Sequence, residues 1–222
     1  MSQGTLTETP PATSPQRKRW TIAEFDGLVR DGYLREGSRA YLWDGEILEP
    51  MSENQPHANA VENLTDLLKG RFHPASWTVN QAHPIVLREG YKPQPDLAVI
   101  RGPRSLYRQN VPTASDVVLL VEVSDSSRAK DLGVFLRAYA EAGIPRYWVV
   151  DIPGRRVDSY ASPTIGPDGE PGYAECQVYG IDAAVPLAFE GEVLEPVPVA
   201  AVLQDSIEPE AGSGQNNVES KQ

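Results

Sequence analysis

The sequence contains a single cysteine, Cys176, among its 222 residues. One cysteine cannot form an intramolecular disulfide, and it excludes the multi-cysteine sites that hold structural metals. Three histidines are present, and His73 and His83 show no metal-ligand spacing with each other or with His57. Any metal site would therefore have to be built from other residue types.

The sequence also has no long apolar run. The longest runs, near residues 117–123 and 147–150, are far shorter than the roughly 20 residues that span a bilayer. The first 20 residues have no apolar core of the kind found in signal peptides. We therefore expect no membrane segment, no secretion and a cytoplasmic location.

Positive charge is scarce as well. The net charge is −11, and residues 20–189 alone carry −7. An acidic domain is a poor general binder of polyanions. Nucleic-acid binding would therefore require a local basic patch or metal ions that offset the acidic charge.

The composition predicts one folded domain between two tails. Residues 1–19 are rich in Pro, Thr and Ser, and residues 204–222 are polar and acidic, so both are expected to be disordered. The apolar fraction of 40% is sufficient for a core in the intervening residues 20–203.

Local signals within this domain predict an α/β fold around a mixed sheet. A capping box at Thr21–Glu24 opens a helix to about Arg30, and Asp44-Gly45 is typical of a hairpin turn. Further helices are expected over 57–71 and 128–142, the latter ending at Gly143. Strands are expected at 77–81, 85–87, 97–100, 117–123, 147–150, 157–160, 173–179 and 193–197, the last two at sheet edges.

One strand carries an unexpected carboxylate. In the run VVLLVEVS from Val117, side-chain alternation places Val118, Leu120 and Glu122 on one face and apolar residues on the other. Apolar residues on both faces indicate a central strand that is covered on both sides. A buried charge at Glu122 is costly unless it has a partner or a metal.

A second carboxylate, Asp96, follows Pro95 at the mouth of the apolar strand 97–100. If the two strands are neighbours, Asp96 and Glu122 converge and offer the hard oxygen ligands that Mg²⁺ or Mn²⁺ prefers. Such a metal can activate water and neutralise charge on a phosphodiester. Alternatively, Asp96 caps a turn and Glu122 pairs with an arginine in an internal ion-pair network.

An ordered set of motifs resembles a known family. These are YLWDGE (41–46), Met51-Ser52 followed by His57, Pro95-Asp96, Glu122-Val-Ser124, Asp131, and YAEAGIPRYWVVD (139–151). Over about residues 20–200 the chain resembles the Uma-type putative endonuclease family of the restriction-endonuclease-like PD-(D/E)XK superfamily. The resemblance implies a mixed β-sheet flanked by helices, with Asp96 and Glu122 holding Mg²⁺ or Mn²⁺ for hydrolysis of DNA.

The chain departs from this pattern at a lysine. The superfamily places that lysine two residues after the glutamate, where this chain has Ser124. The family places it four residues after the position of Asp131, where this chain has Phe135. Lys130 is the nearest candidate replacement, although a solvated surface lysine is the favoured interpretation of this residue. The alternative function is therefore a catalytically impaired relative that binds nucleic acid or a protein.

Other residues have weaker assignments. The resemblance places His57 near the site, and Glu46 is a second candidate for a supporting role. Arg101, Arg104 and Arg108 form a basic cluster that could contact DNA phosphates, although an ordinary solvated loop explains them equally well. Because cleavage of a duplex requires two cuts, a homodimer is a further expectation.

Overall fold

The computed structural model describes residues 17–34, 38–50 and 54–204. Most of both expected tails, together with Met51 and Ser52 of the family motifs, lies outside the described residues. Arg17 and Arg19, which fall in the expected N-terminal tail, contact Glu46 and Asp44 of a neighbouring hairpin.

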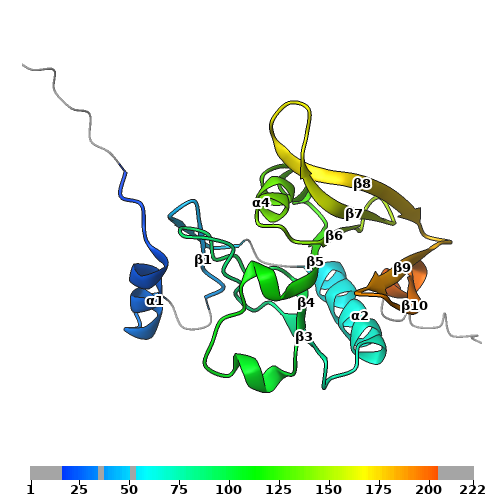
Figure 1. Cartoon of the computed structure of the whole chain (residues 1–222), viewed down its shortest axis with the longest axis horizontal. Helices are drawn as coiled ribbons and strands as arrows, with labels where there is room; N and C mark the ends of the chain where they lie inside the picture. Colours follow the sequence, from blue (N-terminus) through cyan, green and yellow to red (C-terminus); the bar gives the residue numbers. More distant parts are fainter. Residues whose placement is uncertain (1–16, 35–37, 51–53, 205–222) are drawn as a thin grey trace, which may run out of the picture.

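The centre of the fold is a six-stranded sheet, as Figure 1 shows. Only one neighbouring pair, β5 and β6, is parallel, and the other pairs are antiparallel, so the sheet is mixed as predicted. A helical connection joins β5 to β6, because parallel neighbours need a crossover. In sheet order the strands are β3 (Trp77–Gln81), β4 (Leu97–Arg101), β5 (Val117–Ser124), β6 (Arg146–Asp151), β7 (Arg156–Ile165) and β8 (Pro171–Gly180).

Two apolar clusters cover the two faces of this sheet. One contains the long helix α2, the two-stranded sheet β9–β10 and the short helix α5. The other contains residues of the β1–β2 hairpin and of the helix that follows β5. All eight residues of β5 are buried between them, which confirms the prediction of a central strand covered on both sides. The bounds are α1 (Ile22–Arg30), β1 (Tyr41–Trp43), β2 (Glu46–Leu48), α2 (Gln55–Arg71), β9 (Ala184–Phe189), β10 (Glu192–Pro198) and α5 (Val199–Val202).

The predicted local signals are present. Thr21 and Glu24 form the capping box of α1. The β1–β2 turn places Asp44 at φ 49° and Gly45 at φ 67°, the left-handed conformation that an Asp-Gly hairpin turn requires. Asn54 caps α2 by accepting a hydrogen bond from the His57 N–H. These caps fix the entry of the chain into α1 and α2.

The sheet differs from the prediction in three places. Val99 pairs with Leu119 but Ile100 pairs with Val117, so Val118 is an extra residue that forms a β-bulge and packs with the opposite cluster from Leu120. Residues 85–87 form no strand and are held by isolated bridges. The predicted strand near 193–197 pairs with β9 in a sheet of its own rather than at an edge of the main sheet.

The helical segment after β5 is not a regular α-helix along its whole length. It consists of α3 (Arg128–Lys130), a π-helical turn η3 (Asp131–Phe135) and α4 (Leu136–Glu141). Two short 3₁₀ turns, η1 (Arg104–Tyr107) and η2 (Ala114–Asp116), lie between β4 and β5. None of the described helices is long and apolar enough to cross a membrane.

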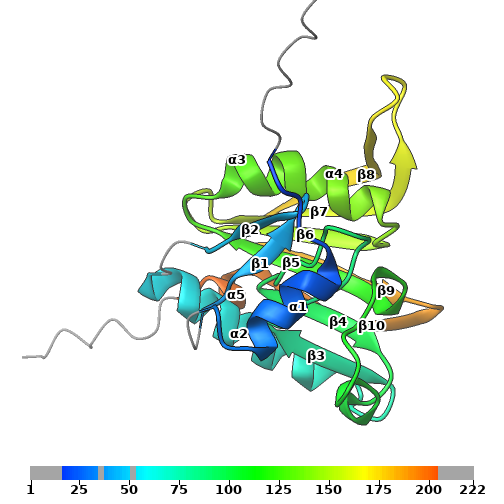
Figure 2. The same cartoon turned by 90° about the vertical axis from the view of Figure 1, so that its left-hand side faces the viewer.

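In Figure 2, α3 and α4 run across the sheet above β6 and β7. The hairpin formed by β7 and β8 extends beyond the rest of the domain in both views. Because α3 begins at Arg128, shortly after β5 ends at Ser124, the start of this helix and Glu122 line the same cavity.

Candidate active site

The pairing of β4 with β5 brings the two predicted carboxylates together. Leu97 pairs with Val121, so the adjacent residues, Asp96 before Leu97 and Glu122 after Val121, lie opposite each other at the same end of the two strands. The Asp96 N–H lies 3.4 Å from Glu122 Oε2. Both residues are buried, with 8% and 7% of their surfaces exposed. The predicted convergence is confirmed.

Asp96 is held from three directions. Its Oδ2 accepts a hydrogen bond from the Val123 N–H at 2.8 Å and lies 3.2 Å from Nε2 of His57. Its Oδ1 lies 3.6 Å from Nη2 of Arg39. His57 comes from the first turn of α2, so the Asn54 cap also sets the position of the imidazole. The structure therefore brings His57 to the site, as the resemblance implied.

Glu122 is the most perturbed carboxylate of the site. Its Oε1 accepts a hydrogen bond from the Tyr139 hydroxyl at 2.7 Å. Burial raises the pKa of Glu122 well above its usual range, and the nearby charges of Asp96 and Asp131 raise it further. Tyr139 and Lys130 oppose this rise. A carboxyl of this kind favours either a proton or an added cation.

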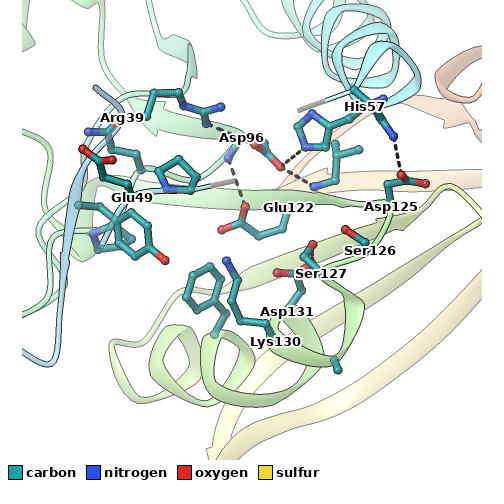
Figure 3. Close-up of a pocket in the computed structure, with 18 residues that line it drawn as sticks. Arg39, Glu49, His57, Asp96, Glu122, Asp125, Ser126, Ser127, Lys130 and Asp131 are labelled. Carbon is teal, nitrogen blue, oxygen red and sulfur yellow. Dashed lines mark hydrogen bonds and ion pairs between the residues drawn. The ribbon is translucent and has the colours of Figure 1, made fainter. Parts of the chain in front are cut away.

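A cavity of about 510 Å³ opens over the two carboxylates. Figure 3 shows its lining, to which the segments around α2, β4 and β5, the residues before β1 and the start of α3 contribute. Pockets of this volume are typical of sites for small molecules or for single groups of a larger ligand.

Lys130 lies at the rim of this cavity. Its Nζ is 4.3 Å from the centre of the Phe135 ring, and Figure 3 shows the amine directed towards Glu122. Residues five apart point about 140° apart in an α-helix, and the π-turn between them reduces this difference because it bonds residue i+5 to residue i. Lys130 therefore stands over Phe135, the residue that occupies the expected lysine position.

Asp131 is a third buried carboxylate at the cavity, with 2% of its surface exposed. Its Oδ2 accepts a hydrogen bond from the Ser127 hydroxyl at 2.5 Å. Burial raises the pKa of Asp131, while the hydrogen bond from Ser127, the charge of Lys130 and the nearby Ser124 hydroxyl lower it. Ser124, at the superfamily's lysine position, is thus a neighbour of Asp131.

The other predicted site residues do not line the cavity. Glu46 lies on β2 within 3.5 Å of Arg17 and Arg19. Arg101 ends β4, five residues and about 16 Å beyond Asp96, and bonds to Glu190 at 2.6 Å. The exposed Arg104 and Arg108 lie in or next to η1, beyond that same end of β4. The structure therefore does not bring the basic cluster to the carboxylates.

An internal ion-pair network does exist, but it lies elsewhere. Arg128 and Arg156 bind Asp151 and Asp158 at distances of 2.6–3.2 Å, which ties the start of α3 to β6 and β7. Asp96 and Glu122 are not part of this network, although Asp96 has its own contact with Arg39. The scaffold interpretation applies to these acids and, through the Arg39 contact, to Asp96 as well.

Comparison with known proteins now adds to this geometry. The model of the family Uma2, described as "Putative restriction endonuclease", matches residues 22–195. The chain belongs to the Uma2 family.

A solved structure has the same fold. It is described as a putative nuclease belonging to DUF820 from Anabaena variabilis, and it is 14% identical in sequence, with a TM-score of 0.60. The match covers 82% of this chain and 97% of the other. No curated protein matches the sequence. At this identity the structural match establishes the shared fold alone.

The donors of this Uma2 site suit a hard divalent cation, but they are few. Two carboxylates converge, and the raised pKa of Glu122 reflects first its burial and then the charges of Asp96 and Asp131, which a cation would offset. Among the described residues, no group of three or more His, Cys, Asp and Glu side chains is placed to hold a metal. Asp96 and Glu122 would therefore hold Mg²⁺ or Mn²⁺ with water at most positions, which is the usual coordination of Mg²⁺.

Sequence reasoning missed two side chains that contact the carboxylates, Tyr139 on Glu122 and Arg39 on Asp96. Arg39 precedes β1 and reaches Asp96, and only 31% of its side chain is exposed. No periodicity or motif singles it out, because its place depends on how the segment before β1 crosses the end of β4. The extra contact brings a second long cation to the cavity, besides Lys130.

Proposed function

We propose that the chain is an endonuclease that hydrolyses phosphodiester bonds of DNA with the help of Mg²⁺ or Mn²⁺ held by Asp96 and Glu122. The observation that carries the proposal is the pairing of these two buried carboxylates across β4 and β5 at the floor of an open cavity. Membership of a family described as restriction endonucleases supports the same class of substrate.

The surrounding residues have distinct roles in this proposal. His57 and the Val123 N–H orient Asp96, and the Tyr139 hydroxyl orients Glu122. A divalent cation, when bound, supplies Lewis acidity towards the phosphate and an acidified water. Lys130 takes the place of the family lysine by stabilising negative charge beside Glu122.

Nicking of supercoiled plasmid with Mg²⁺, and separately with Mn²⁺, tests the proposal. We expect the wild type to nick, Glu122→Gln and Asp96→Asn to lose both nicking and Mn²⁺ binding, and Lys130→Ala to nick about 10²–10³ times more slowly while still binding Mn²⁺. Arg137→Ala is the matched control, because Arg137 is an exposed cation on the same helix that does not line the cavity. A wild type that neither binds Mn²⁺ nor nicks any DNA would refute the proposal.

One observation favours a second function, a catalytically impaired nucleic-acid binder. Phe135 is 6% exposed and packs against Trp43 and Tyr139, so an apolar ring fills the family's lysine position. If the wild type binds Mn²⁺ and DNA without cleavage, and Phe135→Lys gains nicking, the binding function is the better description. Turnover that Glu122→Gln abolishes would exclude it.

The expected partners remain predictions of the same proposal. Arg104 and Arg108 are exposed cations that could contact DNA backbone away from the cavity. A homodimer would supply the second cut of a duplex. The first expectation is tested by the salt dependence of DNA binding in an Arg104→Gln, Arg108→Gln double variant. The second is tested by sedimentation of the intact protein.

A further inference from the structure

Arg39 and Lys130 approach the carboxylate pair from different sides of the cavity, as Figure 3 shows. Arg39 belongs to the segment before β1, and Lys130 belongs to α3. The guanidinium of Arg39 lies 3.6 Å from Asp96 Oδ1, a distance of ion pairing rather than of a direct hydrogen bond. The contact therefore places a positive charge beside Asp96, at the wall of the cavity.

We propose that Arg39 binds the non-bridging oxygens of the substrate phosphate, so that Arg39 and Lys130 hold one phosphodiester between them above Asp96 and Glu122. This inference rests on the endonuclease function proposed above. A guanidinium is planar and carries five donors, so it can bind two phosphate oxygens at once. A lysine ammonium acts as a point charge, and the two cations therefore serve different purposes.

The charge of the cavity favours such a contact. Five acids line its walls and floor: Glu49, Asp96, Glu122, Asp125 and Asp131. A phosphodiester anion would be repelled from these acids unless cations meet it there. Among the described lining residues, Arg39 and Lys130 are the two long basic side chains. The basic residues beyond the other end of β4 are too distant to act on the same phosphate.

The volume of the cavity selects the probe. A space of about 510 Å³ accepts one phosphate with its neighbouring nucleoside groups, whereas a duplex can only lie across its mouth. The probe is therefore the dinucleotide d(TpT), with its uncharged methylphosphonate analogue as the matched ligand. Binding is measured calorimetrically in Ca²⁺, a hard cation that takes oxygen ligands. Mn²⁺ affinity is measured separately without nucleotide.

We expect the wild type to bind d(TpT) more tightly than the methylphosphonate. Arg39→Gln should weaken d(TpT) binding about tenfold, which corresponds to about 1.4 kcal/mol. The variant should also bind the two ligands equally well. Arg39→Lys, which keeps the positive charge but not the planar guanidinium that binds two oxygens, should have an intermediate affinity for d(TpT). Mn²⁺ affinity of Arg39→Gln should be unchanged or higher, because a competing cation beside Asp96 has gone. Arg30→Gln is the matched control, since Arg30 is an exposed arginine that pairs with Asp31 at the end of α1.

Three results would overturn the inference. If Arg39→Gln binds d(TpT) as the wild type does while Glu122→Gln loses Mn²⁺, Arg39 has no phosphate role and the endonuclease proposal still stands. If Arg39→Gln loses Mn²⁺ and d(TpT) affinity equally, Arg39 only positions Asp96. If the wild type binds no Mn²⁺, the proposed function fails and the inference falls with it. Circular dichroism of each variant identifies loss of folding, and Arg39→Lys then carries the test.

Discussion

If Glu122 holds the proposed metal ion, the proton of Glu122 couples metal binding to pH. Burial and the charges of Asp96 and Asp131 raise its pKa well above the ordinary value, so the folded protein holds this proton more tightly than the unfolded chain. The resulting stability is present below the ordinary pKa near 4.5 and is lost as pH rises through the folded pKa. A metal ion must displace the same proton, so metal affinity falls by up to about tenfold for each pH unit below the folded pKa.

We therefore expect saturating Mn²⁺ to raise the melting temperature more at pH 8 than at pH 6. Thermal unfolding monitored by circular dichroism, with and without Mn²⁺, measures the difference. Glu122→Gln should show no Mn²⁺ stabilisation at either pH. Equal stabilisation of the wild type at both values would contradict the assignment of Glu122 as the ligand that gives up a proton.

Tyr139 contributes to how readily Glu122 ionises, against the larger effect of burial. Its hydroxyl, on a fully buried side chain, donates to Glu122 Oε1 at 2.7 Å and so lowers a pKa that burial raises. Tyr139→Phe should raise the pKa of Glu122 further and weaken Mn²⁺ binding at pH 6 several-fold more than at pH 8. Isothermal titration at both pH values measures this, and Tyr33→Phe, a change at a 77% exposed tyrosine, is the control.

Individual site residues were predictable where strand geometry determines them. Asp96 and Glu122 follow from a carboxylate at the end of each of two apolar strands, because neighbouring antiparallel strands bring such ends together. Arg39 could not be predicted, because it belongs to an irregular segment whose path depends on tertiary packing. The bulge at Val118 escaped prediction for a related reason, since every residue around it is apolar and the alternation shows no break.

At the scale of the element, the π-turn between α3 and α4 is the feature that places Lys130. The Leu136 N–H bonds to the Asp131 carbonyl, and the buried Tyr147 hydroxyl donates to that same carbonyl at 3.1 Å. The sequence predicted one helix over 128–142. A π-turn of five residues is too short to change the apolar periodicity of an α-helix in a recognisable way. The hydroxyl of Tyr147, on β6 beneath the helix, therefore supports the turn.

Tyr147→Phe should therefore lower the free energy of unfolding by about 1 kcal/mol, the usual value for one buried hydrogen bond. It should also reduce plasmid nicking, because the start of the helix and Lys130 lose a fixed support. Urea unfolding and nicking assays measure the two effects. A variant with reduced stability but unchanged nicking would show that this hydrogen bond does not control the position of Lys130.

At the scale of the whole molecule, the sheet separates two cores of different character. The face covered by α2 and β9–β10 is mainly aliphatic, and the opposite face contains an aromatic group that includes Tyr139, Tyr147, Tyr160 and Tyr173. The rings of the last three lie 6.0–6.4 Å apart. Alternation and helix signals predicted the two-sided sheet and the strand at 193–197. They missed its partner β9, where Pro186 interrupts the alternating run of Val185, Leu187 and Phe189.

The aromatic face determines how the protein responds to alkali. Burial raises the pKa of Tyr139, Tyr147, Tyr160 and Tyr173 above the ordinary value of 10. A raised pKa means that the folded state holds these protons more tightly, so their contribution to stability is complete below about pH 10 and is lost as pH rises further. The protein should consequently unfold in a cooperative transition above pH 10.

Two signals recorded on one sample between pH 9 and pH 13 measure this transition. Tyrosinate absorbance near 295 nm should rise first for exposed rings such as Tyr33, without a change in far-ultraviolet circular dichroism. A second rise, from the buried rings, should coincide with the loss of helix and sheet signal, because these hydroxyls can lose their protons only when the sheet separates from α4. If all nine tyrosines titrated in one step near pH 10 while the circular dichroism stayed constant, the aromatic face would be open to water, and its role in holding α3 and α4 over the carboxylates would have to be abandoned.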